Sequence, residues 1–200
     1  MTHSMSIHYA SREDLLRLAM GFHPTRDNNF EGGTELERIV EVIIERGDET
    51  AMDALIKASE IHKLTTLNCL VIAGKLRILR RHDISMDHGN GMCYFAVRYN
   101  HLHILRWLES RGHWMGHLLS TAARYGHLRL VQWILTRNEC KMEQEEETQP
   151  RSFDGCPITS ALYGRHFHIL DYLEEYGLQW TQEHHDLNRR FEEMWVPRKD

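Results

Sequence analysis

The sequence contains a segment that repeats itself, and this internal repeat constrains the fold more than any other feature. Residues 96–108 (AVRYNHLHILRWL) align with residues 122–134 (AARYGHLRLVQWI) at an offset of 26, with six of the thirteen positions identical. A further step of 39 residues brings Ala161, His166 and Leu170 into the same register. A recurring unit of this kind indicates an array in which each unit buries its apolar face against its neighbours.

The apolar spacing inside each unit predicts a pair of helices. Leu102, Leu105 and Leu108 recur at three-residue steps and share one face of a second helix. In the same register, Gly112 and Gly177 stand where that helix ends, and Asn138 replaces the glycine in the middle unit. Both residue types tolerate the left-handed backbone found at helix ends. The frame predicts an all-α chain with helix pairs at about 11–47, 52–74, 91–112, 117–138 and 156–177, and then a polar helix at 181–194.

These residues resemble the ankyrin repeat, whose pattern runs T-P-L-H-x-A-A-x-x-G-H before a second helix and a glycine. Residues 121–128 (TAARYGHL) match its centre, and residues 156–159 (CPIT) stand where T-P-L-H belongs. The 26-residue step is shorter than the usual period of about 33 and is similar to the short repeats of protist and giant-virus ankyrin proteins. The resemblance implies an ankyrin-like solenoid of about five helix pairs with a polar C-terminal capping helix. Its parts would be degenerate repeats over 1–90, clear repeats over 91–180 with an acidic insertion at about 139–153, and the capping helix and tail over 181–200.

Fifteen histidines are an unusual number for a chain of 200 residues. The resemblance implies that His101, His127 and His166 lie at the turn between two helices and hydrogen-bond to nearby backbone. The spacings His101-x-His103 and His166-x-His168 make poor metal pairs, because residues two apart on a helix point to different faces. The dipeptide His82-Asp83 is found in metal phosphohydrolases, but the repeat leaves no bundle to complete such a site. His184 and His185 are interpreted as a solvated helix face.

The sequence gives no pattern typical of catalysis. The motifs G-x-S-x-G, G-x-x-x-x-G-K-[ST] and H-E-x-x-H are missing, and residues 89–91 (GNG) are interpreted as a turn that does not cradle phosphate. We therefore expect no enzyme, no cofactor and no metal. Cys69, Cys93, Cys140 and Cys156 lack a C-x2-C spacing, which favours reduced thiols in the cytoplasm or nucleus. The net charge of −5 argues against a general nucleic-acid binder but not against a local basic patch. No apolar run is long enough to span a membrane or begin a secreted chain.

The resemblance implies a concave binding face lined by the first helices and the turns before them. The residues that follow the alanine pair of each unit are placed on that face: Arg98, Tyr99, Arg124, Tyr125 and Tyr163. The residue just before the pair is placed there too: Phe95, Thr121 and Ser160. Tyrosine and arginine are enriched where proteins bind one another. The alternative is that the arginines are merely solvated and the tyrosines support the turns.

Two charged segments have a structural and a functional interpretation each. The acidic run 139–147 is either a solvated loop or a docking segment for a basic partner. The basic run Lys75–Arg81 either continues the array or contacts RNA or an acidic protein. The function we expect is a protein–protein interaction module, an adaptor or effector. The alternative is a structural subunit built permanently into a large assembly, such as an organelle complex or a virion, and a histidine-dependent metalloenzyme ranks third.

Overall fold

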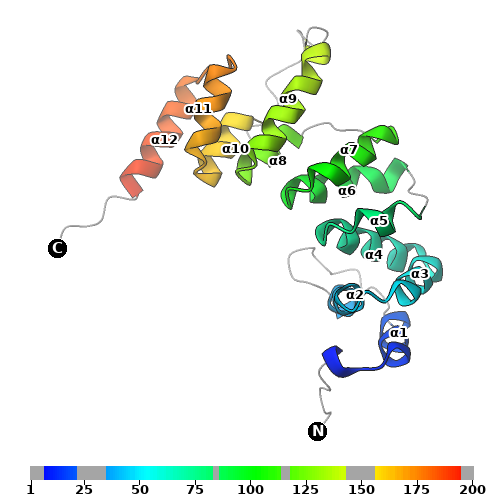
Figure 1. Ribbon diagram of the computed structural model, residues 1–200. Coiled ribbons are helices and arrows are strands. Elements are labelled where there is room, and N and C mark those ends of the chain that lie inside the picture. Colours follow the sequence, from blue (N-terminus) through cyan, green and yellow to red (C-terminus); the bar gives the residue numbers. More distant parts are fainter. Residues whose placement is uncertain (1–6, 22–34, 83–85, 114–117, 143–155, 195–200) are drawn as a thin grey trace, which may run out of the picture. The chain divides into compact units, whose positions relative to one another are not determined.

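The computed structural model describes residues 7–21, 35–82, 86–113, 118–142 and 156–194, with only the backbone at 86–88, 90 and 138–142. Within these ranges every regular element is helical, which confirms the all-α prediction for this part of the chain. A short 3-10 turn, Ile7–Tyr9, is followed by α1 (Arg12–Met20), α2 (Glu35–Glu45), α3 (Glu49–Ala58), α4 (Glu60–Ile72), α5 (Leu76–Leu79), α6 (Met86–Arg98), α7 (Leu102–Ser110), α8 (Leu118–Arg124), α9 (Leu128–Met142), α10 (Pro157–Gly164), α11 (Phe167–Glu175) and α12 (Gln182–Met194) (Figure 1).

The chain forms two compact units. The first comprises Met1–Ala96 and Arg106–His113, and the second comprises Val97–Leu105 and Trp114–Asp200. Helices α6 and α7 therefore contribute residues to both units, whereas the sequence-based division falls at residue 90.

The first unit is built on the strongly amphipathic helix α2, whose buried face carries Leu36, Ile39, Val40 and Ile43. Helices α1, α3 and α4 pack against α2. Burying each of these side chains contributes on the order of 1.5–3 kcal/mol. The buried His62 of α4 joins α4 to α1, because its Nε2–H donates to the carbonyl of Ala19 at 2.8 Å.

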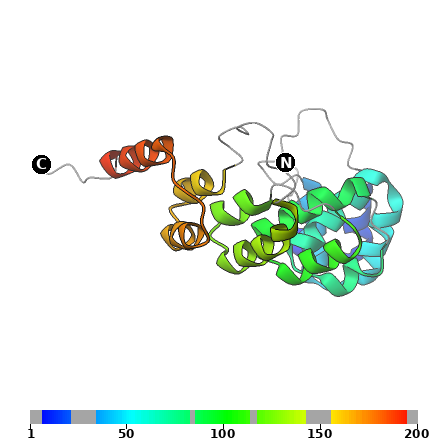
Figure 2. The same cartoon turned by 90° about the horizontal axis from the view of Figure 1, so that it is seen from above.

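The second unit contains two helix pairs, α8 with α9 and α10 with α11. Helix α8 packs against α10, α9 packs against α11, and α12 contacts α10 (Figure 2). Ala122, Ala123 and Ala161 are fully buried, and these small side chains let the first helices approach closely. The approach is closest at Gly164, where an added Cβ would lie 2.2 Å from the carbonyl oxygen of Arg124.

The same turn ends successive helices. In α11, the Gly177 N–H donates to the Glu174 carbonyl and the Leu178 N–H donates to the Leu173 carbonyl, at 2.9 and 3.0 Å, which is the Schellman pattern. The residue at this position has a positive φ after the second helices of the pairs, at Gly47 (α2), Gly74 (α4), Gly112 (α7) and Gly177 (α11). A positive φ also follows the first helices, at Asn100 (α6), Gly126 (α8) and Arg165 (α10). The repeat in the sequence is therefore also a repeat in backbone conformation.

Residues 89–91 and Asn138, which the sequence predicts to lie at a turn and at a helix end, both lie inside helices. Residues 89–91 lie inside α6 and do not form a turn. The buried ring of His113 occupies the place where a Cβ of Gly89 would be, with Nδ1 only 1.9 Å from that point. Asn138 does not end its helix, because α9 continues to Met142. The residues after Asn138 (ECKM) include neither Gly nor Pro, so the local sequence favours continuing the helix.

Candidate functional site

The candidate site lies in the second unit, where the first helices end. The guanidinium of Arg98 lies over two tyrosine rings, at 5.8 Å from the centroid of Tyr99 and 5.4 Å from that of Tyr125. The Tyr125 ring in turn stacks on His127, with centroids 6.4 Å apart and an interplanar angle of 18°. The Tyr125 ring therefore lies between the guanidinium of Arg98 and the ring of His127, in contact with both. Such cation–π contacts orient an arginine that is otherwise mobile.

Arg98, Tyr99, Arg124, Tyr125 and Tyr163, which we call the Arg–Tyr surface, differ in how much each side chain is exposed. Both arginines are exposed, Tyr99 is 43% exposed and Tyr163 is 52% exposed, while Tyr125 is half-buried. The ring of Tyr163 also contacts Phe191 of α12 at 5.5 Å. These side chains offer both charge and aromatic area to solvent, which is the combination found at protein-binding hot spots.

The other three predicted contact residues contribute less to this surface. Ser160 is 7% exposed, so its hydroxyl is withdrawn into the packing of α10. Thr121 is half-buried on α8. Phe95 belongs to the first unit, where its half-buried ring makes an edge contact with Tyr94 at 5.7 Å.

Histidines at the turns hydrogen-bond to the backbone of the two arginines. The Nε2–H of His127 donates to the carbonyl of Arg98 at 3.0 Å. His166, the equivalent residue of the next pair, hydrogen-bonds to the backbone of Arg124, the equivalent of Arg98. Burial lowers the pKa of His166, although this hydrogen bond opposes the shift. His101 is at the same position of its own pair, and its ring makes an edge contact with His103 at 5.6 Å.

The glycines around His166 explain why one tyrosine of the pattern is missing. A Cβ at Gly126 would lie 2.6 Å from the His166 ring, and a Cβ at Gly164 would meet both that ring and the Arg124 carbonyl. Gly164 occupies the position of Tyr99 and Tyr125 in the sequence register. No larger side chain fits there, so Tyr163 is the aromatic residue of the third pair.

The histidines that could suggest metal chemistry have other surroundings. His82 Nε2 lies 3.2 Å from Asp53 Oδ1, and burial lowers the pKa of His82. Asp83 lies outside the described residues. In the part of the chain that the structure describes, no group of three or more His, Cys, Asp or Glu side chains is arranged to hold a metal ion.

The basic segment Lys75–Arg81 is paired with acidic residues of α3. Arg77 Nη2 lies 2.7 Å from Glu49 Oε1, and Arg81 contacts the other oxygen of Glu49. Arg81 is also 3.9 Å from Asp53. The two arginines lower the pKa of the Glu49 carboxyl through their hydrogen bonds. These contacts support the interpretation that the segment continues the helical packing. Of the acidic insertion, the structure describes only the backbone of 139–142, in α9.

Sequence reasoning did not find the pairing of Cys156 with His184. The interpretation of His184 as solvated is wrong, because its side chain is 6% exposed. The Thr181 N–H donates to His184 Nδ1 at 3.0 Å, so the proton of the neutral ring is on Nε2, which lies 3.3 Å from Cys156 Sγ. The pair thus joins α12 to the start of α10. The signal that was available is the three-residue spacing from Thr181 to His184 at a helix start.

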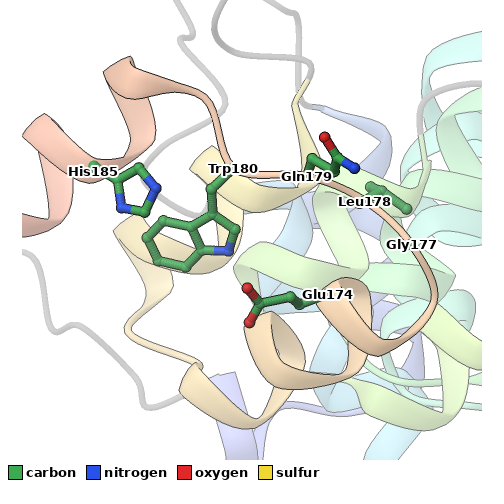
Figure 3. A pocket seen from close by; sticks show the side chains of 6 residues that line it. All are labelled: Glu174, Gly177, Leu178, Gln179, Trp180 and His185. Carbon is green, nitrogen blue, oxygen red and sulfur yellow. The ribbon is translucent and has the colours of Figure 1, made fainter.

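A pocket of about 400 Å³ opens between the end of α11 and the start of α12 (Figure 3). It is lined by Glu174, Gly177, Leu178, Gln179, Trp180 and His185. The Glu174 side chain reaches from α11 toward the indole of Trp180. The Trp180 ring is also in contact with His185, with centroids 5.1 Å apart, and with His184 edge-on at 6.5 Å. No sequence pattern pointed to this pocket, because Trp180 and His185 follow the last repeat, although Gly177 recurs as a helix-end residue.

Comparison with known protein families, with curated proteins and with solved structures gave no match to this chain. Among the helices described, none combines the length and the apolar character needed to cross a membrane.

Proposed function

We propose that this protein is an ankyrin-type helical repeat protein that binds another protein through the Arg–Tyr surface and does not catalyse a reaction. The repeated register, the repeated Schellman turns and the packing of α8 on α10 and α9 on α11 support the repeat architecture. We also propose the cytoplasm or nucleus as its location, supported by the free thiols of Cys69, Cys93 and Cys156.

The observation that carries the proposal is the orientation of Arg98. Two tyrosine rings hold its guanidinium, and His127 holds its backbone carbonyl. A side chain that is already ordered loses less conformational entropy on binding, which favours its use in recognition. Its exposed donors fit a carboxylate of the partner, and the neighbouring rings provide apolar contact.

The alternative function, a permanent subunit of a larger assembly such as an organelle complex or a virion, is favoured by apolar side chains on the first unit. Leu18, Met20 and Ile61 are large hydrophobic side chains that remain exposed on α1 and α4. An obligate subunit buries such residues against its neighbours. Sedimentation of the purified chain distinguishes the two functions, because a free adaptor stays monodisperse and an obligate subunit self-associates.

The test is affinity capture from the native source with wild-type protein and with the double substitution Tyr99→Ala and Tyr125→Ala. We expect the double variant to lose the captured partner, since each truncated hot-spot residue costs on the order of 1–3 kcal/mol of binding. The matched control is Tyr9→Ala, because Tyr9 is an exposed tyrosine of the first unit. Circular dichroism establishes that all variants are folded. An unchanged partner set in the double variant contradicts the proposal.

A further inference from the structure

Among the side chains that line the pocket of Figure 3, Glu174 is the acidic one. Residues 166–188 contain five acidic residues, Asp171, Glu174, Glu175, Glu183 and Asp186, and neither lysine nor arginine. This run includes all of α11 and the first half of α12. Asp186 is paired with Arg189, so the charge that this segment brings to the opening itself is that of Glu174, and a carboxylate there favours a cation.

The end of α11 adds to that potential. Carbonyl groups at a helix C-terminus carry partial negative charge, so basic side chains are the favourable residues there. Helix α11 has the opposite arrangement, because its last turn carries Glu174 and Glu175 and no basic residue. A cation placed beside this helix end gains from both the carboxylates and the helix dipole.

The pocket also has an aromatic wall. Trp180 lines the opening together with Glu174, and indole is the aromatic ring that attracts cations most strongly. An indole next to a carboxylate distinguishes an organic cation from a bare metal ion, because the alkyl part of the organic cation packs against the ring while its charge meets the acid. The volume of about 400 Å³ accommodates a side chain or a small molecule.

From these observations we infer that the pocket between α11 and α12 binds an organic cation, a guanidinium or an alkylammonium group. The group is held by the Trp180 ring and the Glu174 carboxylate at the C-terminal end of α11. This site is separate from the Arg–Tyr surface and has the opposite charge.

The experiment is a titration followed by the indole N–H signals in ¹H–¹⁵N NMR spectra of the full chain, with Trp180→Phe used to assign the Trp180 signal. The probes are N-acetyl-arginine methylamide, N-acetyl-lysine methylamide, tetramethylammonium and the uncharged N-acetyl-norleucine methylamide. We expect a saturable shift of the Trp180 signal with at least one cation and none with the norleucine amide. A response to tetramethylammonium indicates a site for free organic cations, and a response restricted to the amino-acid amides indicates a site for a peptide side chain.

The decisive variant is Glu174→Gln, which removes one charge from an exposed side chain and leaves its shape. We expect it to weaken cation binding by about fivefold or more. Glu193→Gln, at an exposed glutamate near the other end of α12, is the matched control and leaves binding unchanged. Equal shifts with the norleucine amide, no shift with any cation, or unchanged affinity in Glu174→Gln would each overturn the inference. Because the double tyrosine variant retains this site, the outcome is independent of the Arg–Tyr surface.

Discussion

Two glycines of the same helix should respond in opposite ways to replacement by alanine. Gly89 and Gly91 both lie within α6, so Gly→Ala gains about 1 kcal/mol of helix propensity at either position. Gly91 has nothing within 4 Å of an added Cβ, whereas at Gly89 three atoms of the His113 ring lie 1.9–2.4 Å from it. His113 is 4% exposed, so its ring cannot turn into solvent without leaving the packing.

The magnitudes follow from these contacts. Gly91→Ala is expected to stabilise the protein by about 0.5–1 kcal/mol. In Gly89→Ala the same gain is opposed by displacement of a buried ring, and overpacking of a core costs roughly 1–3 kcal/mol or more. We expect a net loss of about 1–2 kcal/mol in the free energy of unfolding, measured by urea denaturation with far-ultraviolet circular dichroism.

A double-mutant cycle tests the stated cause. In a His113→Ala background the obstructing ring is gone, so Gly89→Ala should become neutral or stabilising, and the coupling between the two changes should exceed about 1 kcal/mol. Gly89→Ala that is as stable as Gly91→Ala, or a cycle without coupling, refutes the reasoning that the ring excludes the side chain.

Further predictions concern protonation and the thiols. Burial lowers the pKa of His113, His166, His184 and His82 in the folded protein. Their contribution to the free energy of unfolding is therefore complete above the unfolded pKa of about 6.5 and is lost as the pH falls through the pKa values of the folded protein. The urea concentration at the midpoint of unfolding should decrease from about pH 7.5 to about pH 5.5. A midpoint that is constant or rises on acidification contradicts this. Cys156→Ala leaves the His184 Nε2–H without its acceptor and should cost about 1–2 kcal/mol, seen as faster hydrogen exchange in α12, while Cys156→Ser retains an acceptor and costs less. Burial raises the pKa of Cys69 and of Cys93 to about 12, so both should resist a thiol reagent at about pH 8 until urea unfolds the chain, whereas the half-exposed Cys156 reacts in the folded protein.

The sequence predicts helices well here because their signals are local. The spacing of Leu102, Leu105 and Leu108 and the position of Gly112 depend only on the chain itself, and helices are found close to each expected pair. The continuation of α9 past Asn138 is an exception with a local cause, whereas two other exceptions have non-local causes. The ring of His113, 24 residues away in sequence (89 to 113), excludes a side chain at Gly89. The buried His184 contacts Cys156, the residue before α10.

The candidate site is less predictable than the fold, for a related reason. The register locates Arg98 and Tyr125, but not the contact between them, because that contact depends on how one pair packs on the next. Of the pocket beside Trp180, the repeat locates Gly177 but neither Trp180 nor His185, and the absence of lysine and arginine from residues 166–188 is the further mark of its segment in the sequence.

The histidine bonds make the position of each of these arginines depend on two neighbouring pairs and not on one. His127 holds the carbonyl of Arg98, which belongs to the preceding pair, and His166 does the same for Arg124. His166 lies 39 residues after its equivalent, His127, whereas His127 lies 26 residues after His101. The extra residues between the two pairs therefore do not prevent α10 from packing on α8. Each arginine of the Arg–Tyr surface is therefore positioned by the pair that follows it. Under the proposed function, a substitution of His166 should weaken the contact between Arg124 and the partner, although His166 itself does not belong to the Arg–Tyr surface.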